Sequence, residues 1–274
     1  MIKKIIFSVS LLSIILFTAF VFRSNETSVY SGNVQQNLND IRRTCGTMAD
    51  LEMQYKLDPT YKQRMADMEK YVEKFTKEYS RKEGDLIVIT IPVVVHVVWN
   101  TPVQNISDEQ VLSQIDVLNK DFRRLNSDTT NTPAPWKSLG ADCQIEFKMA
   151  RRDPNGIPTL GITRTQTSIT EFGQSSSLKF TSQGGHDAWD RDRYLKLWAA
   201  NLGSQLLGYA TFPGGNPSLD GVAIGYNFFG TVGTLSPPYN KGRTATHEVG
   251  HWLWLYHIWG DDNGSCGGSD LVGD

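Results

Sequence analysis

The sequence carries little net charge, and no charge of one sign gathers in any part of it. Its 274 residues contain 27 Lys and Arg against 29 Asp and Glu, a formal net charge of −2. Without a basic stripe there is no support for nucleic-acid binding, and without an acidic tail there is none for a disordered acidic segment. Internal repeats are also lacking. With 39% apolar residues, the chain can bury the core of one full domain and a small additional segment, but not of two large domains.

Cysteine and histidine are scarce, with three Cys and five His. An odd number of Cys leaves at least one thiol without a partner inside the chain. Cys143 lies in a strand-like run and Cys266 in a loop near the C-terminus, so a disulfide between them, with Cys45 free, is one alternative. Three of the five His, by contrast, fall within a single short run near the C-terminus. That run carries most of the functional information in the sequence.

The run begins with His247-Glu248-Val249-Gly250-His251. Two His four residues apart lie on one face of a helix, where their imidazoles can share one tetrahedral zinc ion. A carboxylate directly after the first ligand can accept a proton from the water that zinc activates and pass it to a leaving amine. A buried helix with hydrogen-bonded His is the alternative, but a chance H-E-x-x-H in such a chain is expected at roughly the one per cent level. The pattern therefore favours a zinc-dependent peptidase.

His257 lies six residues beyond His251, too far around a continuous helix to reach the same ion. The helix, expected from about Arg243 to Leu253, must therefore end in a sharp turn that returns His257 to the metal. Metzincin peptidases place glycine in this turn, in the pattern H-E-x-x-H-x-x-G-x-x-H, whereas this chain has Trp254. A bulky residue at positive φ costs on the order of 1–3 kcal/mol and zinc binding contributes about 10–16 kcal/mol, so zinc can hold the bend.

The run HEVGHWLWLYH resembles the zinc motif of the pappalysin family of metzincins, which includes ulilysin-like secreted proteases of bacteria. Ile91–Val98, Gly161–Thr167 and Asp220–Tyr226 also resemble strands and connections of that family's catalytic domain. The resemblance covers residues 86–274. It implies an α/β (α+β) fold, a metzincin-like zincin upper subdomain with a twisted mixed sheet, a backing helix and an active-site helix.

The resemblance further implies a secreted zinc endopeptidase that acts on protein or peptide substrates. By the same resemblance, the ligands of Zn²⁺ would be His247, His251 and His257, and the general base would be Glu248. Metzincins carry a Met-containing turn well after the third His, but here the last Met is Met149. We therefore expect the catalytic domain to be truncated before that turn, with the lower subdomain largely missing and the partner of Cys266 beyond the chain's end. A zinc-binding but catalytically inactive exported fragment is the alternative.

Residues 1–22 have the charged start and apolar core of an export signal, because Lys3-Lys4 precede the apolar run Ile5–Phe22. This run is long for a signal peptide and just long enough for a membrane span, and the cleavage pattern near Ala19 is poor. A cleaved signal and an uncleaved anchor both stay open. Either way we expect the rest of the chain outside the cytoplasm, in contact with a membrane only if the segment is uncleaved.

Residues 23–85 are polar and rich in Lys and Glu, and we interpret them as a propeptide. Tyr55–Tyr79 is expected to be helical, and Asn33–Asp40 a loop or short helix. The thiolate of Cys45, within Arg43-Thr44-Cys45-Gly46-Thr47, can fill the fourth zinc position and keep the precursor latent. Prosegments of pappalysin-like bacterial enzymes are similar in carrying such a Cys, although an incidental thiol is the alternative. Arg81-Lys82 is a point where an exposed loop could be cut.

The remaining sequence predicts strands and one amphipathic helix. The β-branched run Leu86–Trp99 is typical of a buried strand, and further strands are expected at Gln144–Arg151, Leu195–Ala199 and Gly221–Tyr226. Resemblance places the last of these at the sheet edge, where a peptide substrate would pair with it.

A helix is expected after the first strand. Ser107 and Gln110 predict a capping box at its start, and Ile106 and Val111 predict a hydrophobic staple. Its apolar face, which should back the sheet, comprises Val111, Ile115, Leu118, Phe122 and Leu125.

Two further sets of potential ligands are not assigned to the zinc site. His96 lies in an apolar strand and is interpreted as structural, and His186 has no ligand spacing. Asp261, Asp262 and Asp270 lie in a Gly-rich loop that could bind Ca²⁺, with a solvated acidic loop as the alternative.

Overall fold

The computed structural model describes residues 44–78, 87–261 and 267–272. The predicted signal or anchor, the predicted loop Asn33–Asp40, and Arg81-Lys82 lie outside these residues. Within the described part of the chain, no helix has the length and apolar character needed to cross a membrane.

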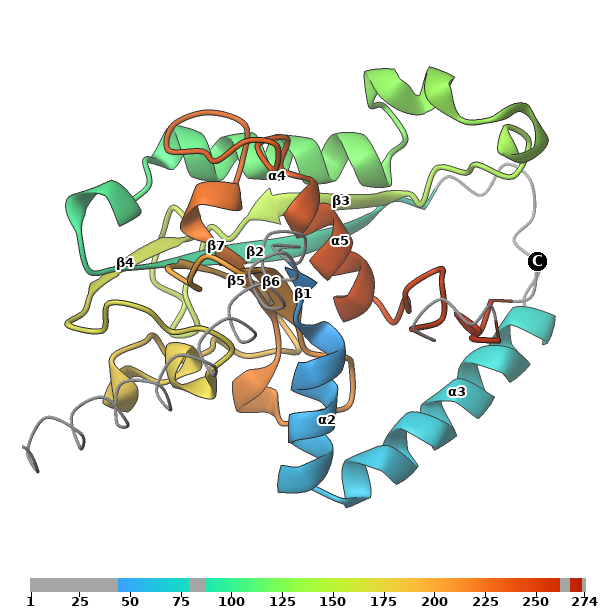
Figure 1. Ribbon diagram of the computed structural model, residues 1–274, viewed down its shortest axis with the longest axis horizontal. Helices are drawn as coiled ribbons and strands as arrows, with labels where there is room; N and C mark the ends of the chain where they lie inside the picture. Colours follow the sequence, from blue (N-terminus) through green and yellow to red (C-terminus); the bar gives the residue numbers. More distant parts are fainter. Residues whose placement is uncertain (1–43, 79–86, 262–266, 273–274) are drawn as a thin grey trace, which may run out of the picture. The chain divides into compact units, whose positions relative to one another are not determined.

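A seven-stranded mixed sheet forms the centre of the structure (Figure 1). Its strands follow the order β1-β6-β7-β5-β2-β3, and β4 also pairs with β2. All pairs are parallel except β6 with β7. The strand bounds are Thr44–Cys45 (β1), Ile89–Trp99 (β2), Ile145–Met149 (β3), Ile162–Gln166 (β4), Leu195–Ala200 (β5), Leu206–Ala210 (β6) and Val222–Gly225 (β7).

β2 is the longest strand, and its C-terminal half is deeply buried. Its run Val93–Val98 is almost fully shielded from solvent, as expected for parallel strands that are covered on both faces. One edge of β2 pairs with β5, and the other pairs first with β3 and then with β4. The continuous β-branched sequence thus predicts this strand correctly.

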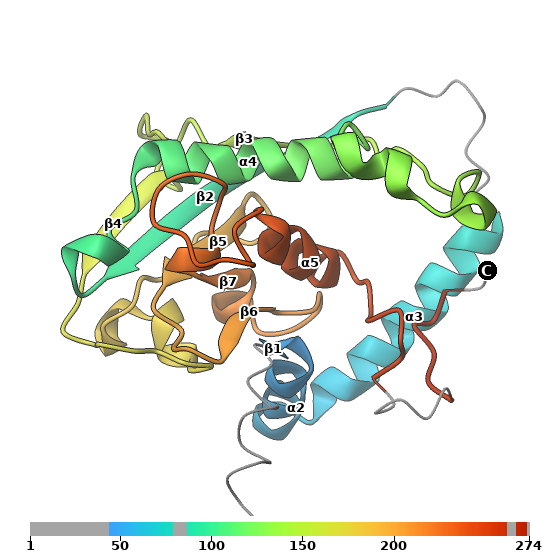
Figure 2. The ribbon, with the colours of Figure 1, turned by 45° about the horizontal axis from the view of Figure 1, so that its top comes forward.

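Helix α4 (Asp108–Phe122) backs one face of the sheet, with α5 (Arg243–Trp252) beside it (Figure 2). Ser107 caps α4 as predicted, accepting a hydrogen bond from the backbone of Gln110. The side chain of Gln110 does not complete the capping box, because its amide donates to backbone carbonyls of the loop after β7. The predicted apolar face is buried except for Leu125, which lies beyond the end of α4 and is 72% exposed.

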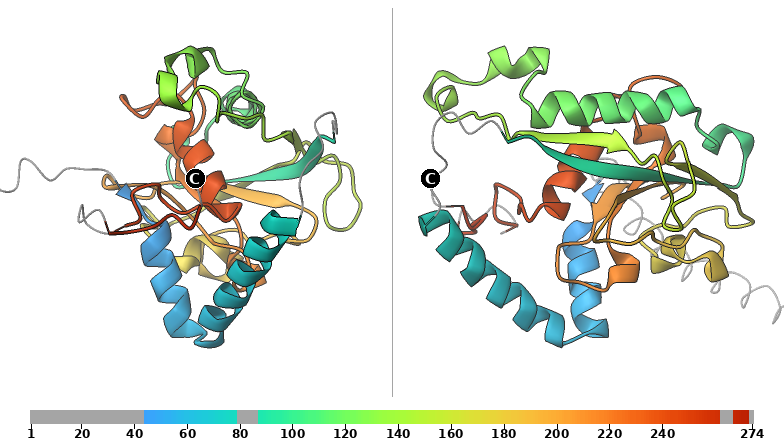
Figure 3. Two further views of the ribbon diagram at one scale, coloured as in Figure 1. Left: turned by 90° about the vertical axis from the view of Figure 1, so that its right-hand side faces the viewer. Right: turned by 180° about the vertical axis from the view of Figure 1, so that it is seen from behind.

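The N-terminal segment, residues 44–78, forms β1 and two helices, α2 (Thr47–Leu57) and α3 (Thr60–Glu78). A single helix over Tyr55–Tyr79 was therefore a wrong prediction. Asp58 precedes Pro59, which disfavours helical backbone at Asp58, and the Asp58 carboxylate accepts the backbone N–H of Thr60 at 3.0 Å to begin α3. Figure 3 shows the two helices diverging from this break.

The predicted edge strand is in the interior of the sheet. β7 lies between β5 and β6, and β6, which was not predicted, separates it from β1. Without β1, β6 would be the outer strand on this side.

Candidate metal centre

Three imidazoles meet at the C-terminal half of α5. His247 and His251 lie one turn apart on α5, and their Nε2 atoms are 3.1 Å apart. The Nε2 atom of His257 lies 3.2 Å from that of His247 and 3.1 Å from that of His251. The structure thus brings together the three His that the sequence predicts.

The bend that returns His257 lies where the sequence predicts it. α5 ends at Trp252, and Trp254 has φ 81°, in the left-handed region that normally favours glycine. The backbone N–H of Leu255 donates to the carbonyl of Gly250 at 3.0 Å and closes the turn.

Contacts with the N-terminal segment hold the side chain of Trp254, whose backbone is strained. Its indole N–H donates to the Glu69 carboxylate of α3 at 3.0 Å. The ring also packs edge-on against Phe212 and Tyr256, in a cluster with Leu51 of α2. This packing offsets part of the cost of a bulky residue at positive φ.

Hydrogen bonds at Nδ1 orient two of the imidazoles. His251 Nδ1 lies 2.6 Å from the carbonyl oxygen of Leu255, and His257 Nδ1 lies 2.7 and 2.9 Å from the two oxygens of Asp261. A carbonyl or carboxylate oxygen can only accept, so each Nδ1 carries the proton and each Nε2 presents a lone pair. Converging lone pairs of this kind favour a bound cation, and partners at Nδ1 are typical of metal-binding His.

The thiol of Cys45 completes the group. Its Sγ is 3.6 Å from His251 Nε2, and the four potential ligand atoms all lie within 4.8 Å of one another. Ligands at zinc distances in a tetrahedral site are about 3.3 Å apart for two nitrogens and about 3.5 Å apart for a nitrogen and a sulfur. The donor set and its separations therefore fit zinc.

Glu248 lies beside this group and is 1% exposed. Its Oε2 accepts hydrogen bonds from the hydroxyl of Thr47 at 2.8 Å and from the thiol of Cys45 at 3.5 Å. Burial raises the pKa of Glu248 to about 7, against the two hydrogen bonds, which lower it. Burial also raises the pKa of the Cys45 thiol, and the nearby Glu248 carboxylate raises it further. A bound divalent cation acts on the thiol in the opposite direction.

The N-terminal segment reaches these side chains by pairing with β6. The backbone N–H groups of Thr44 and Gly46 donate to the carbonyls of Gln205 and Gly208, both at 2.8 Å. Thr47 then accepts the backbone N–H of Ala210 at 2.8 Å while donating to Glu248. The segment therefore covers the sheet edge, the imidazoles and the carboxylate together. No sequence pattern indicates this role of Thr47.

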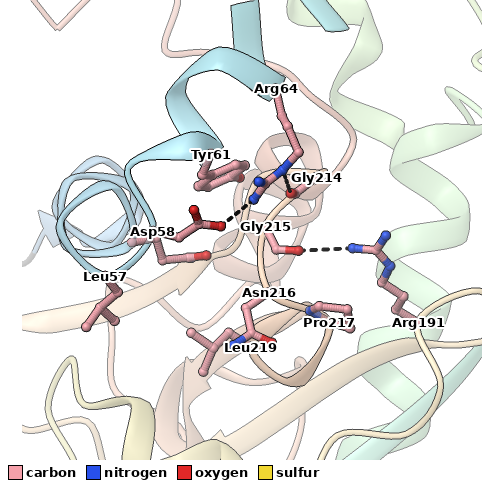
Figure 4. Close-up of a pocket in the computed structure, with 11 residues that line it drawn as sticks. Leu57, Asp58, Tyr61, Arg64, Arg191, Gly214, Gly215, Asn216, Pro217 and Leu219 are labelled. Carbon is pink, nitrogen blue, oxygen red and sulfur yellow. Dashed lines mark hydrogen bonds and ion pairs between the residues drawn. The ribbon is translucent and has the colours of Figure 1, made fainter. Parts of the chain in front are cut away.

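A cavity of about 480 Å³ lies away from the imidazoles, between the N-terminal segment and the loop after β6 (Figure 4). Arg64 crosses it from α3, pairing with Asp58 at 2.7 Å and donating to the carbonyl of Gly214 at 3.0 Å. Arg191 donates to the carbonyl of Gly215 at 3.0 Å. The contact of Arg64 with Gly214 joins the segment to the loop, and none of the candidate metal ligands lines the cavity.

The other potential ligands are not members of this group. His96 is buried in β2 with Nδ1 2.7 Å from the hydroxyl of Thr163, and His186 stacks on it. The carboxylate of Asp261, a predicted calcium ligand, accepts a hydrogen bond from His257 Nδ1. Asp262 lies outside the described residues. Cys143 is an exposed free thiol, and Cys266 also lies outside them. Among the residues that the structure describes, the Cys45 group is the one cluster of three or more potential metal ligands.

The known proteins that are similar to this chain are metalloproteases. No protein-family model matches the chain. An extracellular metalloprotease of Arthroderma otae is 33% identical over 199 residues, which cover 68% of this chain and 58% of the relative. One from Arthroderma benhamiae is 31% identical over 195 residues. The chain thus spans a little over half the length of these curated relatives.

Solved structures of mirolysin from Tannerella forsythia are more similar in sequence to this chain than these curated relatives are. Mature mirolysin in complex with a cleaved peptide is 56% identical, with a TM-score of 0.67, and the match covers 69% of this chain and 71% of mirolysin. A promirolysin mutant is 51% identical, with a TM-score of 0.74, and the match covers 85% of this chain and 75% of promirolysin.

Proposed function

The chain belongs to the pappalysin family of metzincin peptidases, and on that premise we propose that it is a zinc-dependent endopeptidase made as a latent precursor. The observation that carries the proposal is the convergence of three imidazoles and one thiol beside a buried carboxylate. Substrates would be proteins or peptides. Since the curated relatives are extracellular, the enzyme would act outside the cytoplasm, with residues 1–22 as signal peptide or anchor.

His247, His251 and His257 would hold the metal through Nε2. When bound, zinc lowers the pKa of a water molecule towards about 7 and polarises the carbonyl of the peptide bond. Leu255 and Asp261 keep the protons of two imidazoles on Nδ1, which leaves Nε2 free to bind. Calcium binding by Asp261, Asp262 and Asp270 stays a prediction.

Glu248 would act as the general base. Its carboxylate accepts a proton from the attacking water and later delivers that proton to the nitrogen of the leaving amine. Its position suits this role, because Glu248 directly follows His247 on α5 and lies beside the imidazoles without being one of the grouped ligands. No further side chain of the described residues is needed for the proton transfer.

Residues 23–85 would be the prosegment and residues 86–274 the catalytic domain. Latency would have three parts: Cys45 takes the fourth ligand position, Thr47 engages the general base, and β1 covers the edge of β6. A peptide substrate would need the fourth ligand position, the Glu248 carboxylate and the edge of β6. Removal of the segment would free them together.

The test is Glu248→Gln in the chain after its prosegment has been cut and removed. Because Glu248 is not a ligand in this proposal, the variant should keep one zinc per chain and lose at least about 100-fold in the rate of casein cleavage, the range general-base catalysis contributes. Cleavage by the variant at the wild-type rate would overturn the assignment.

A further inference from the structure

Two lysine side chains are buried beside the C-terminal end of β6. Lys179, in the short 3-10 helix Ser176–Lys179, and Lys196 of β5 are each at most 1% exposed. Lys196 forms an ion pair with the buried carboxylate of Asp220. Lys179 donates to the hydroxyl of Thr211 at 3.1 Å and to the carbonyl of Leu219, neither of which carries a charge. The part of the chain after residue 86 thus supplies two buried cations and one buried anion here.

The second anion comes from the N-terminal segment. Asp50 of α2 is 4% exposed, and its Oδ2 accepts the side-chain amide of Gln54 at 2.5 Å. The same oxygen lies 3.4 Å from the Thr211 hydroxyl that Lys179 contacts. Burial lowers the pKa of Lys179 to about 8, while Asp50 and then Asp220 raise it. Burial likewise raises the pKa of Asp50, while Lys179 lowers it, so each of the two groups favours the charged form of the other.

The position of Thr211 links this charge to the place where substrate would bind. Thr211 directly follows β6, three residues beyond Gly208, which is the partner of Cys45. Cys45 and Asp50 belong to one segment, so its removal would uncover the edge of β6 and the Lys179 ammonium together. The rings of Trp198 and Tyr209, 5.3 and 5.2 Å from the Lys179 nitrogen, keep that nitrogen in place. A poorly solvated ammonium without an anion is costly, which favours a new carboxylate at the vacated position.

We infer that Lys179 and Thr211 form a subsite for an acidic side chain of the peptide substrate, at the place that Asp50 holds in the precursor. The inference rests on the proposed peptidase function. Thr211 lies just beyond the C-terminal end of β6, so a peptide that pairs antiparallel to β6 would place there a residue N-terminal to the bond that is cut. Asp50 would then act as an internal mimic of a substrate carboxylate.

The test uses enzyme prepared as the full chain and then freed of its prosegment. Peptides that differ only by Glu or Gln, at each of the four residues on both sides of the cleaved bond, are compared by kcat/KM. At one position N-terminal to that bond we expect the Glu peptide to be preferred at least 10-fold. Lys179→Met should reduce this Glu/Gln ratio to about 1, and Lys148→Met, which removes an exposed lysine of β3, should leave it unchanged. A ratio near 1 at every position in the wild type, or a ratio that survives Lys179→Met, would overturn the inference.

Binding separates this inference from the proposed activity. The same peptides are titrated by fluorescence anisotropy against the Glu248→Gln variant freed of its prosegment. A Glu peptide that binds at least 10-fold more tightly supports the subsite even if no peptide is cleaved, and equal binding of all pairs overturns it. If circular dichroism shows that Lys179→Met is unfolded, Thr211→Val should lower the ratio at the same position, and an unchanged ratio would again overturn the subsite.

Discussion

Replacement of Thr47 tests how the N-terminal segment is held on the metal centre. Thr47 is fully buried, and its hydroxyl both donates to Glu248 and accepts the backbone N–H of Ala210, each at 2.8 Å. Thr47→Val keeps the shape of the side chain and removes both hydrogen bonds. A hydrogen bond to a charged group contributes about 1.5–3 kcal/mol, and a buried donor without a partner costs about 1–3 kcal/mol. We therefore expect the docked segment to lose at least about 2–3 kcal/mol relative to the detached one.

At 1.4 kcal/mol per factor of ten, this loss raises the detached population roughly 30- to 150-fold. The assay is the rate at which iodoacetamide alkylates Cys45 in a chain whose other two cysteines, Cys143 and Cys266, are replaced by Ser. In the docked state Cys45 is half-buried with its Sγ against Glu248 and His251, so labelling faster than in the wild type reports the detached population. Thr47→Ser keeps the hydroxyl and should stay within threefold of the wild-type rate. A wild-type labelling rate in Thr47→Val would refute the proposed clamp.

Two further predictions concern zinc affinity and the core. Asp261→Asn weakens the hydrogen bond that orients His257, so the affinity for zinc should fall about 10- to 100-fold. The affinity is measured by competition with a chelating dye. Asp270→Asn in the same loop is the control, and equal affinities for the two variants would exclude the orienting role. Leu118→Ala opens a cavity between α4 and the sheet and should lower the free energy of unfolding by about 2–5 kcal/mol in urea titration. Leu125→Ala, at an exposed position, should change it by less than about 0.5 kcal/mol, and similar losses in both variants would contradict the assigned core face.

Local geometry explains what the sequence could predict. The spacing of His247 and His251 fixes their common helix face, and the six residues to His257 require the bend, which the structure places at Trp254. The Ser107 cap and the buried strand β2 follow from equally local patterns. None of these inferences depends on how distant segments meet.

Apart from the helix break at Asp58-Pro59, which has a local cause, the failures involve contacts between distant segments. β6 is short and contains Gly208, so its strand signal is weak, and the order of strands that puts β6 rather than β7 at the edge is a property of the whole sheet. The contacts of Thr47 with Glu248 and of Asp50 with Thr211 each join residues more than 150 positions apart. Nothing in the spacing of these residues could have predicted them.

In the precursor, one zinc ion should be bound by His247, His251, His257 and Cys45 together. Zinc K-edge X-ray absorption on the purified full chain tests it directly. We expect one zinc per chain with three nitrogens at about 2.0–2.1 Å and one sulfur at about 2.3 Å, and the loss of the sulfur shell in Cys45→Ala. A zinc site without sulfur in the wild-type chain, or a chain that binds no zinc, would contradict it.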